Sequence, residues 1–125
     1  YEKLGFHGIM SLGEKWHGAT GLPIPLGVDL VSRHIGNELA QTIADASLAS
    51  INYARANEDI ALEYALGFGR GINPADGKKF VRMYVNEDTV DMGEEGRHAL
   101  EKLFSMAVER GVLGELPKLD ILQAK

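Results

Sequence analysis

The sequence predicts an α/β protein in which two or three short strands precede about four helices. Before residue 36, apolar residues come in short runs interrupted by glycine and proline, as in strands and connections. After residue 36 they recur every three or four positions, as in amphipathic helices. Because a lone strand is not stable, this order favours a piece of a larger α/β domain.

Two segments of the first part are predicted to be strands. Residues 6–12 form a short, mostly apolar run, and residues 13–21, with three glycines, are expected to form a loop. Residues 22–33 are the clearer strand candidate. Pro23 and Pro25 lack a backbone N–H, so the first part of this strand can lie only at a sheet edge or in an extended connection.

The rest of the chain is expected to form four helices. The first runs from residue 37 to about 56, the second ends at the glycines after residue 66, and the fourth ends at Gly111. Pro74 follows Asn73 at the start of the third helix. Glu94 stands three positions after Asp91, as in a capping box at the start of the fourth helix. The expected N-caps are Asn37, Asn57, Asn73 and Asp91.

Composition narrows the class of protein. With 125 residues, 45% hydrophobic and 25% charged, the chain is expected to fold as about one domain. A net charge of −5 disfavours nucleic acid as a partner, and the lack of a long apolar run disfavours a membrane span. The absence of cysteine excludes disulfides and thiolate metal sites. We therefore expect a cytoplasmic protein.

No catalytic or metal-binding motif stands out among the residues. The histidines lack the local spacing of a metal site, and the glycine-rich stretches match neither a phosphate-binding loop nor a nucleophile elbow. The basic residues near position 80 belong to an acidic chain and are expected to face solvent instead of forming a nucleic-acid patch. The histidines are His7, His17, His34 and His98. Residue patterns alone thus lead no further than a soluble α/β piece.

A resemblance to a known family goes further. The strings are T-G-L-P-I-P-L-G at 20–27, Y-V-N-E at 84–87 and D-M-G-E-E-G at 91–96, together with Leu12, Gly13 and Trp16. In this order and separation they resemble the 1,4-dihydroxy-6-naphthoate synthases of the futalosine route to menaquinone. The similarity extends over nearly the whole chain, and the combination is more specific than any single string.

The resemblance implies the C-terminal part of a two-lobed, type II periplasmic-binding-protein fold. Residues 1–21 would end the second lobe, and residues 22–33 would be a strand crossing back to the first lobe. Residues 34–125 would form the helical part of the first lobe and a C-terminal tail. The two prolines suit a crossing segment, because they keep it extended and stiff.

The implied reaction splits cyclic dehypoxanthine futalosine, a small molecule, into 1,4-dihydroxy-6-naphthoate and a sugar-derived fragment, without metal or redox cofactor. The general base of the resembled family is a histidine in an H-E-x-R-F-T-Y-like segment. Tyr1 matches its last residue, so the base would lie upstream, and none of the four histidines aligns with it. The cleft-wall candidates within the chain are Leu22, Pro23, Pro25 and Leu26.

Three alternatives remain open at this point. The chorismate dehydratases of the same pathway share the implied fold but generally lack the I-P-L-G continuation and the Y-V-N and G-E-E-G pair. A solute-binding protein of the same fold would lack the upstream H-E. A helical interaction module would need to bury its own core. If a first-lobe sheet is missing, apolar faces at residues 24–31 and 39–43 lose their partners, and we expect self-association.

Overall fold

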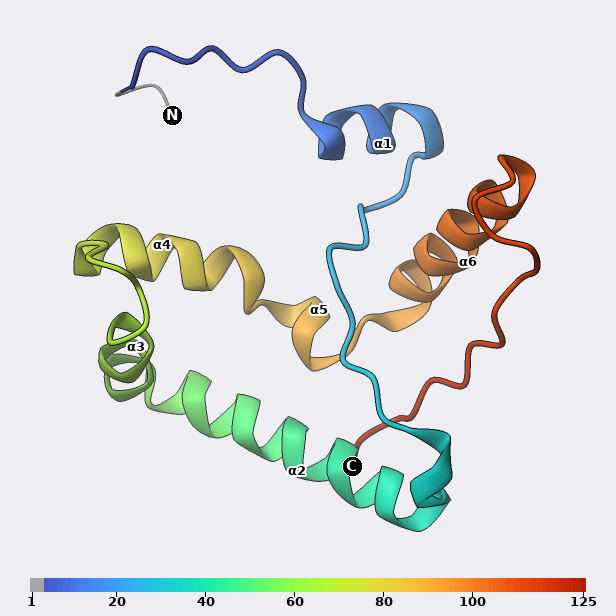
Figure 1. Cartoon of the computed structure of the whole chain (residues 1–125). Coiled ribbons are helices and arrows are strands. Elements are labelled where there is room, and N and C mark those ends of the chain that lie inside the picture. The colour runs from blue at the N-terminus through green and yellow to red at the C-terminus, as the bar shows by residue number, and fades with distance from the viewer. Residues whose placement is uncertain (1–3) are drawn as a thin grey trace. The chain divides into compact units, whose positions relative to one another are not determined.

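The computed structural model describes residues 4–125, and this part of the chain is helical (Figure 1). Its elements, in chain order, are α1 (Leu12–Thr20), the short 3-10 helix η2 (Arg33–Ile35), α2 (Asn37–Ala56), α3 (Glu58–Leu66), α4 (Pro74–Tyr84), α5 (Glu87–Val90) and α6 (Gly93–Glu109). No strand occurs among the described residues. The predicted α/β class is therefore wrong, and the structure gives no support to a two-lobed periplasmic-binding-protein fold.

The strand predictions fail because the expected strands have no partners. Within both predicted segments, 6–12 and 22–33, the residues outside helices form no ladder. Apolar composition favours a strand only where a neighbouring strand pairs the backbone groups and covers one face. Neither condition is met, and Leu26 and Leu30 stay largely exposed. Residues 22–33 are thus a connection that ends in η2, not a crossing strand.

The glycine-rich segment predicted to be a loop is the helix α1. Ser11 caps its first turn by accepting a hydrogen bond from the Glu14 N–H at 3.3 Å. Gly21 ends it in the left-handed conformation, at φ 72°, and its N–H donates to the His17 carbonyl. Caps at both ends offset the poor helix propensity of the glycines inside the segment. The loop prediction gave these glycines too much weight because it considered composition alone.

The later helices were predicted well, although three of their four caps were not. The span of α2, Asn37–Ala56, agrees with the prediction, but Gly36 occupies the cap position and Asn37 is the first helical residue. Asn57 does precede α3, yet its amide donates to the Tyr53 carbonyl instead of capping the helix. The start of α4 at Asn73 and Pro74 is confirmed. Helix α6 begins at Gly93, so Asp91 is not its cap as predicted; Asp91 instead ends the unpredicted α5.

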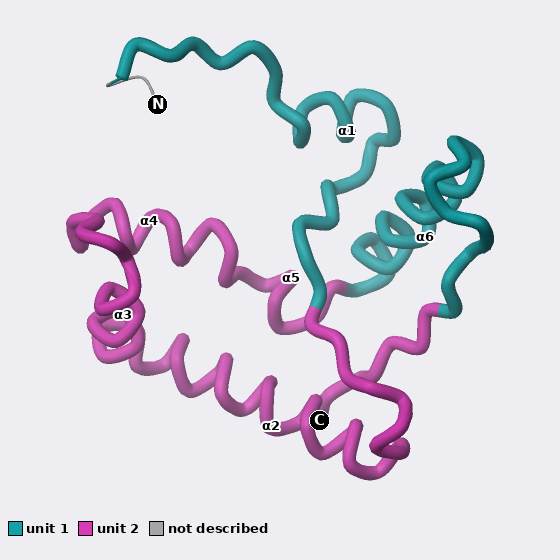
Figure 2. The backbone as a smooth tube through the Cα atoms, in the orientation of Figure 1, with its two compact units in different colours: residues 1–28, 93–118 teal, residues 29–92, 119–125 magenta. Residues whose placement is uncertain are grey.

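The chain divides into two compact units, coloured separately in Figure 2. Unit 1 comprises residues 1–28 and 93–118, of which residues 4–28 and 93–118 are described, and it holds α1 and α6. Ala99 and Leu100 of α6 are buried. Gly111, at φ 70°, follows the end of α6 where the sequence predicted a stop.

Unit 2 comprises residues 29–92 and 119–125 and holds η2 and helices α2 to α5. Helix α3 packs against both α2 and α4, and the buried Gly77 of α4 lies against the Leu66 side chain. The C-terminal tail runs beside α2, where Gln41 donates to the Gln123 carbonyl at 2.8 Å and the Lys125 N–H donates to Asp45 at 2.9 Å.

The described residues bury few apolar side chains. The buried apolar residues among them are only Ala40 in unit 2 and Ala99 and Leu100 in unit 1, whereas many large apolar side chains are exposed. The accessible surface is 10,273 Å². Two separate compact units of this total mass would expose roughly 8,000 Å². The chain therefore exposes about 2,000 Å² more surface than two compact units of the same mass would, and this extra surface is available to further polypeptide.

Candidate functional site

The four cleft-wall candidates lie in the connection that follows α1. Trp16 of α1 donates from its indole Nε1 to the Pro23 carbonyl at 2.8 Å, and this bond fixes the connection to the helix. Leu22 and Pro25 are half-buried, whereas Pro23 and Leu26 are exposed. Among these four candidates, the side chains therefore provide apolar surface and no titratable group.

Thr20 and His17 hold the start of the same connection. The Thr20 hydroxyl donates to the Trp16 carbonyl at 2.8 Å and accepts from the Leu22 N–H at 3.1 Å. His17 Nδ1 lies 3.4 Å from the Leu22 carbonyl oxygen, so a protonated Nδ1 can donate to it. The segment that the resemblance singled out is thus positioned by α1. Its role in binding stays a prediction.

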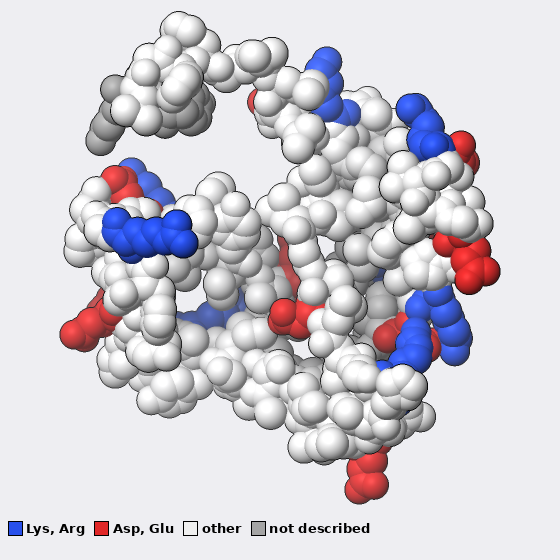
Figure 3. All heavy atoms as spheres, in the orientation of Figure 1, with Lys and Arg blue, Asp and Glu red and all other residues white. Residues whose placement is uncertain are grey.

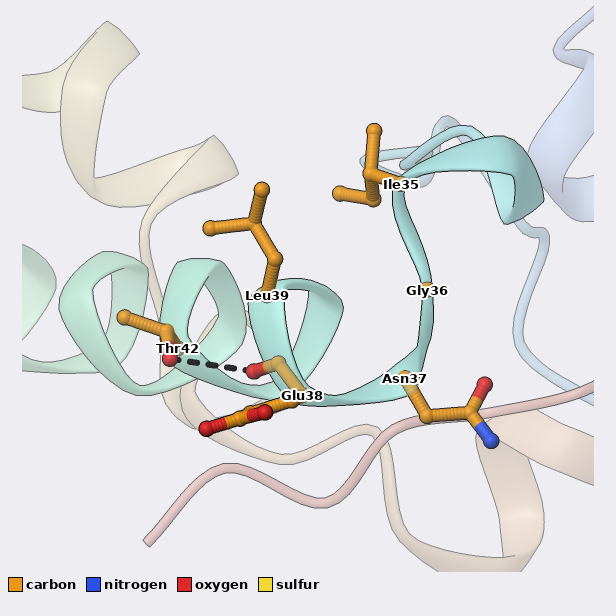
Figure 4. Close-up of a pocket in the computed structure, with 6 residues that line it drawn as sticks. All are labelled: Ile35, Gly36, Asn37, Glu38, Leu39 and Thr42. Carbon is orange, nitrogen blue, oxygen red and sulfur yellow. Dashed lines mark hydrogen bonds between the residues drawn. The ribbon is translucent and has the colours of Figure 1, made fainter.

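A hollow of about 510 Å³ lies elsewhere, at the beginning of α2 (Figure 4). In the close-up the Ile35 and Leu39 side chains extend toward the same side, and Asn37 points away from them. The Thr42 hydroxyl donates to the Glu38 carbonyl at 3.0 Å. The lining holds one carboxylate and no cation: Ile35, Gly36, Asn37, Glu38, Leu39 and Thr42. None of the four cleft-wall candidates is among them.

A second hollow, of about 450 Å³, adjoins a cluster of ion pairs where α2 meets α3. Glu58, the first residue of α3, contacts Arg82 Nε at 2.6 Å and Lys78 Nζ at 2.8 Å. Arg55 of α2 forms a bidentate pair with Glu87 of α5. These bonds tie α3 to α4 and α2 to α5 through charges at the surface, where such pairs contribute little each but fix geometry.

The ion pairs shift the acidity of the carboxylates involved. The hydrogen bond from Arg82, and then that from Lys78, lowers the pKa of Glu58 to about 2. The hydrogen bond from Arg55 lowers the pKa of Glu87 in the same way. Both carboxylates are therefore ionised and engaged near neutral pH. A carboxylate held in this state is a poor general base, so the cluster fits a structural role better than proton transfer.

Sequence reasoning missed this cluster, although it treated Lys78 and Arg82 as a solvated face. Glu58 lies 24 positions from Arg82, and no local spacing announces the contact. The only available signal was the acidic first turn of α3, which the helix dipole already explains. On the face shown in Figure 3, basic and acidic residues are interspersed without an extended patch of one sign.

The described residues contain no group of three or more His, Cys, Asp or Glu side chains arranged to hold a metal ion. His7, His17, His34 and His98 are all exposed. No helix in the part of the chain that the structure describes is long and apolar enough to cross a membrane. Tyr1, which the resemblance aligns with the end of the catalytic segment, lies outside the described residues.

Comparison with known proteins places the chain in a family. A curated relative from Streptomyces coelicolor, 1,4-dihydroxy-6-naphthoate synthase, is 34% identical over 116 residues, which are 93% of this chain and 41% of that protein. A protein of the same name from Thermus thermophilus is 34% identical over 118 residues, 94% of this chain and 43% of the relative. The chain thus spans about two fifths of the length of these relatives. No solved structure matches it significantly. The family described as menaquinone biosynthesis matches residues 1–109, and the chain belongs to that family.

Proposed function

We propose that this chain is part of a 1,4-dihydroxy-6-naphthoate synthase, a carbon–carbon lyase that acts on cyclic dehypoxanthine futalosine. The observation that carries the proposal is the 34% identity to two proteins of that name over more than nine tenths of the chain. The family match over residues 1–109 supports the pathway, menaquinone biosynthesis. A cytoplasmic location is part of the same proposal and agrees with the absence of cysteine.

The chain contributes apolar wall, and not the general base, to the site of this enzyme. The connection after α1 carries the wall: Leu22, Pro23, Pro25 and Leu26 present apolar surface, and the Trp16 indole holds them through the Pro23 carbonyl. An aromatic substrate suits such a surface, because binding sites are lined mostly by apolar groups with few polar ones. The base is the histidine of the upstream segment that the resemblance implies.

The 125 residues alone are then inactive. Loss of a general base typically removes a factor of about 10²–10⁴ in rate. Loss of the remaining walls also removes the positioning of the substrate, which can contribute up to ~7–11 kcal/mol to lowering the barrier. Together these losses put turnover below detection. The few buried apolar residues of the chain support the idea that its folded surroundings include further polypeptide.

The proposal is tested by release of dihydroxynaphthoate, followed by its absorbance, from cyclic dehypoxanthine futalosine. The 125 residues alone should give none, and a longer protein that contains them with the upstream histidine should give product. In that longer protein, Leu26→Asp should raise KM, whereas Leu30→Asp, at another exposed position in the same connection, should not. Turnover by the 125 residues alone would refute the assignment of the base. A folded, inactive longer protein would favour a solute-binding function.

A further inference from the structure

The short helix η2 is a single turn joined to α2 by a glycine. The Ile35 N–H donates to the Ser32 carbonyl at 3.3 Å. The Gly36 N–H donates to the Arg33 carbonyl, also at 3.3 Å. Gly36 then leads into α2 at φ 82° and ψ 160°, a conformation that is essentially confined to glycine. One turn of 3-10 helix beside a glycine joint is expected to open readily unless another segment holds it.

Residues 119–125, from the other end of the sequence, hold this turn. Arg33 Nη2 lies 3.0 Å from Asp120 Oδ2. Leu119 and Ile121, on either side of Asp120 in the sequence, are half-buried, so the backbone that carries the carboxylate is seated on the protein. An exposed ion pair contributes little by itself, but here the partner of Arg33 is presented by a segment that is fixed elsewhere.

The same segment is fixed to α2. The Gln41 amide donates to the Asp45 carboxylate and to the Gln123 carbonyl, each at 2.8 Å. The Lys125 N–H donates to the same carboxylate oxygen of Asp45 at 2.9 Å. Since Gln41 and Asp45 lie one turn apart on α2 and are bonded to each other, both side chains are held in place to receive the segment.

These contacts bind one segment to two elements. The bonds to α2 fix where residues 119–125 lie, and the ion pair then fixes η2 relative to α2 across the joint at Gly36. Figure 2 shows this segment in the same unit as α2. We propose that residues 119–125 are a strap that holds η2 against α2 through the pair of Arg33 and Asp120. The strap also sets the direction in which the connection of residues 22–33 reaches α2, and it does not depend on the proposed enzymatic function.

The test is a charge exchange at the ion pair, followed by amide hydrogen exchange resolved by residue in the 125-residue chain. Arg33→Asp and Asp120→Arg each place like charges opposite one another. The amides of Ile35 and Gly36, which close η2, should then exchange about threefold faster, the size expected for an exposed ion pair. The double variant Arg33→Asp/Asp120→Arg restores the pair with its charges reversed, and both amides should return to their original rates.

A third variant separates a strap from an isolated ion pair. Gln41→Ala removes the hydrogen bond to the Gln123 carbonyl and leaves both charges of the pair in place. It should still make the η2 amides exchange about twofold faster, because the strap is loosened. Arg110→Asp and Glu115→Arg are the matched controls, since they make the same charge changes at exposed positions of unit 1, and they should leave these amides unchanged. Circular dichroism at 222 nm checks that the helices persist in every variant.

Three results would overturn the proposal. Unchanged exchange at Ile35 and Gly36 in the single charge variants, or equal acceleration by the controls, shows that the ion pair does not hold η2. A double variant that exchanges as fast as the single ones shows that the two side chains do not act as a pair. Unchanged η2 amides in Gln41→Ala show that the ion pair acts alone, so that residues 119–125 are no strap.

Discussion

Replacing Gly77 by alanine tests how closely α3 and α4 pack. A Cβ at this position would lie 2.5 Å from Leu66 Cδ2 and 3.6 Å from Ile72 Cγ2, so the Leu66 side chain must shift to admit it. Two effects oppose each other. Alanine gains about 1 kcal/mol over glycine inside a helix. Forcing an extra methyl group into a packed contact costs about 1–3 kcal/mol.

The structure favours a net loss in the free energy of unfolding. Although Cδ2 is the end of a flexible side chain, Leu66 is half-buried and must shift among the residues that bury it, so the cost falls in the middle of that range. We expect Gly77→Ala to destabilise the chain by about 1 kcal/mol. In a Leu66→Ala background the clash is absent, and the same change should stabilise by about 1 kcal/mol. The coupling between the two positions is then about 2 kcal/mol.

Urea unfolding followed by circular dichroism at 222 nm measures all four proteins of this cycle. Gly18→Ala in α1 is the matched control, because a Cβ there has nothing within 4 Å, and it should stabilise by the full helix-propensity gain. If Gly77→Ala stabilised the chain by the same amount in both backgrounds, α3 and α4 would not pack as described, and the reasoning would be refuted.

The remaining predictions concern caps, charge and the connection after α1. Asn73→Ala should cost about 1 kcal/mol of unfolding free energy, measured in urea, because its side chain accepts from the Asp76 N–H at 2.9 Å; an unchanged midpoint would place the start of α4 elsewhere. Glu58, with a pKa lowered from 4.5 to about 2, stabilises the fold above pH 4.5, and that contribution is lost as the pH falls toward 2. Glu58→Gln should make the urea midpoint depend less on pH across this window. If the pH dependence of the midpoint is the same as in the unchanged chain, the ion-pair cluster is contradicted. Trp16→Phe should lower the free energy of unfolding by only about 0.5–1 kcal/mol, because the exposed Pro23 carbonyl can bond to water instead. Amide exchange should become faster only in the connection after α1, and unchanged exchange there would contradict the role of the Trp16 bond to Pro23.

The helices were predictable where local chemistry decides the structure. Asn73 followed by Pro74 marks a helix start by a cap and a fixed φ, and both signals act within four residues. The span of α2 followed from its apolar periodicity alone. Local signals failed at Gly36 and Asn37, because an asparagine near a helix start does not reveal which residue is the cap.

The strands were not predictable because a strand is a property of two segments. Apolar, β-branched stretches such as residues 27–31 indicate only that a strand is possible there, and pairing depends on residues far along the chain. The ion pairs of Glu58 were hidden for the same reason. The candidate site came from resemblance to a family, and the structure adds what positions it, namely the Trp16 bond to the Pro23 carbonyl.

The central claim is that this chain can perform the part of the corresponding segment in a 1,4-dihydroxy-6-naphthoate synthase. The most direct measurement replaces the matched segment of the Thermus thermophilus relative, 43% of its length, by these residues. The chimera is then assayed for dihydroxynaphthoate release from cyclic dehypoxanthine futalosine, beside the unaltered relative and the 125 residues alone. We predict that the chimera and the relative release product and that the 125 residues do not. A chimera that unfolds cooperatively on heating yet releases no product would contradict the account.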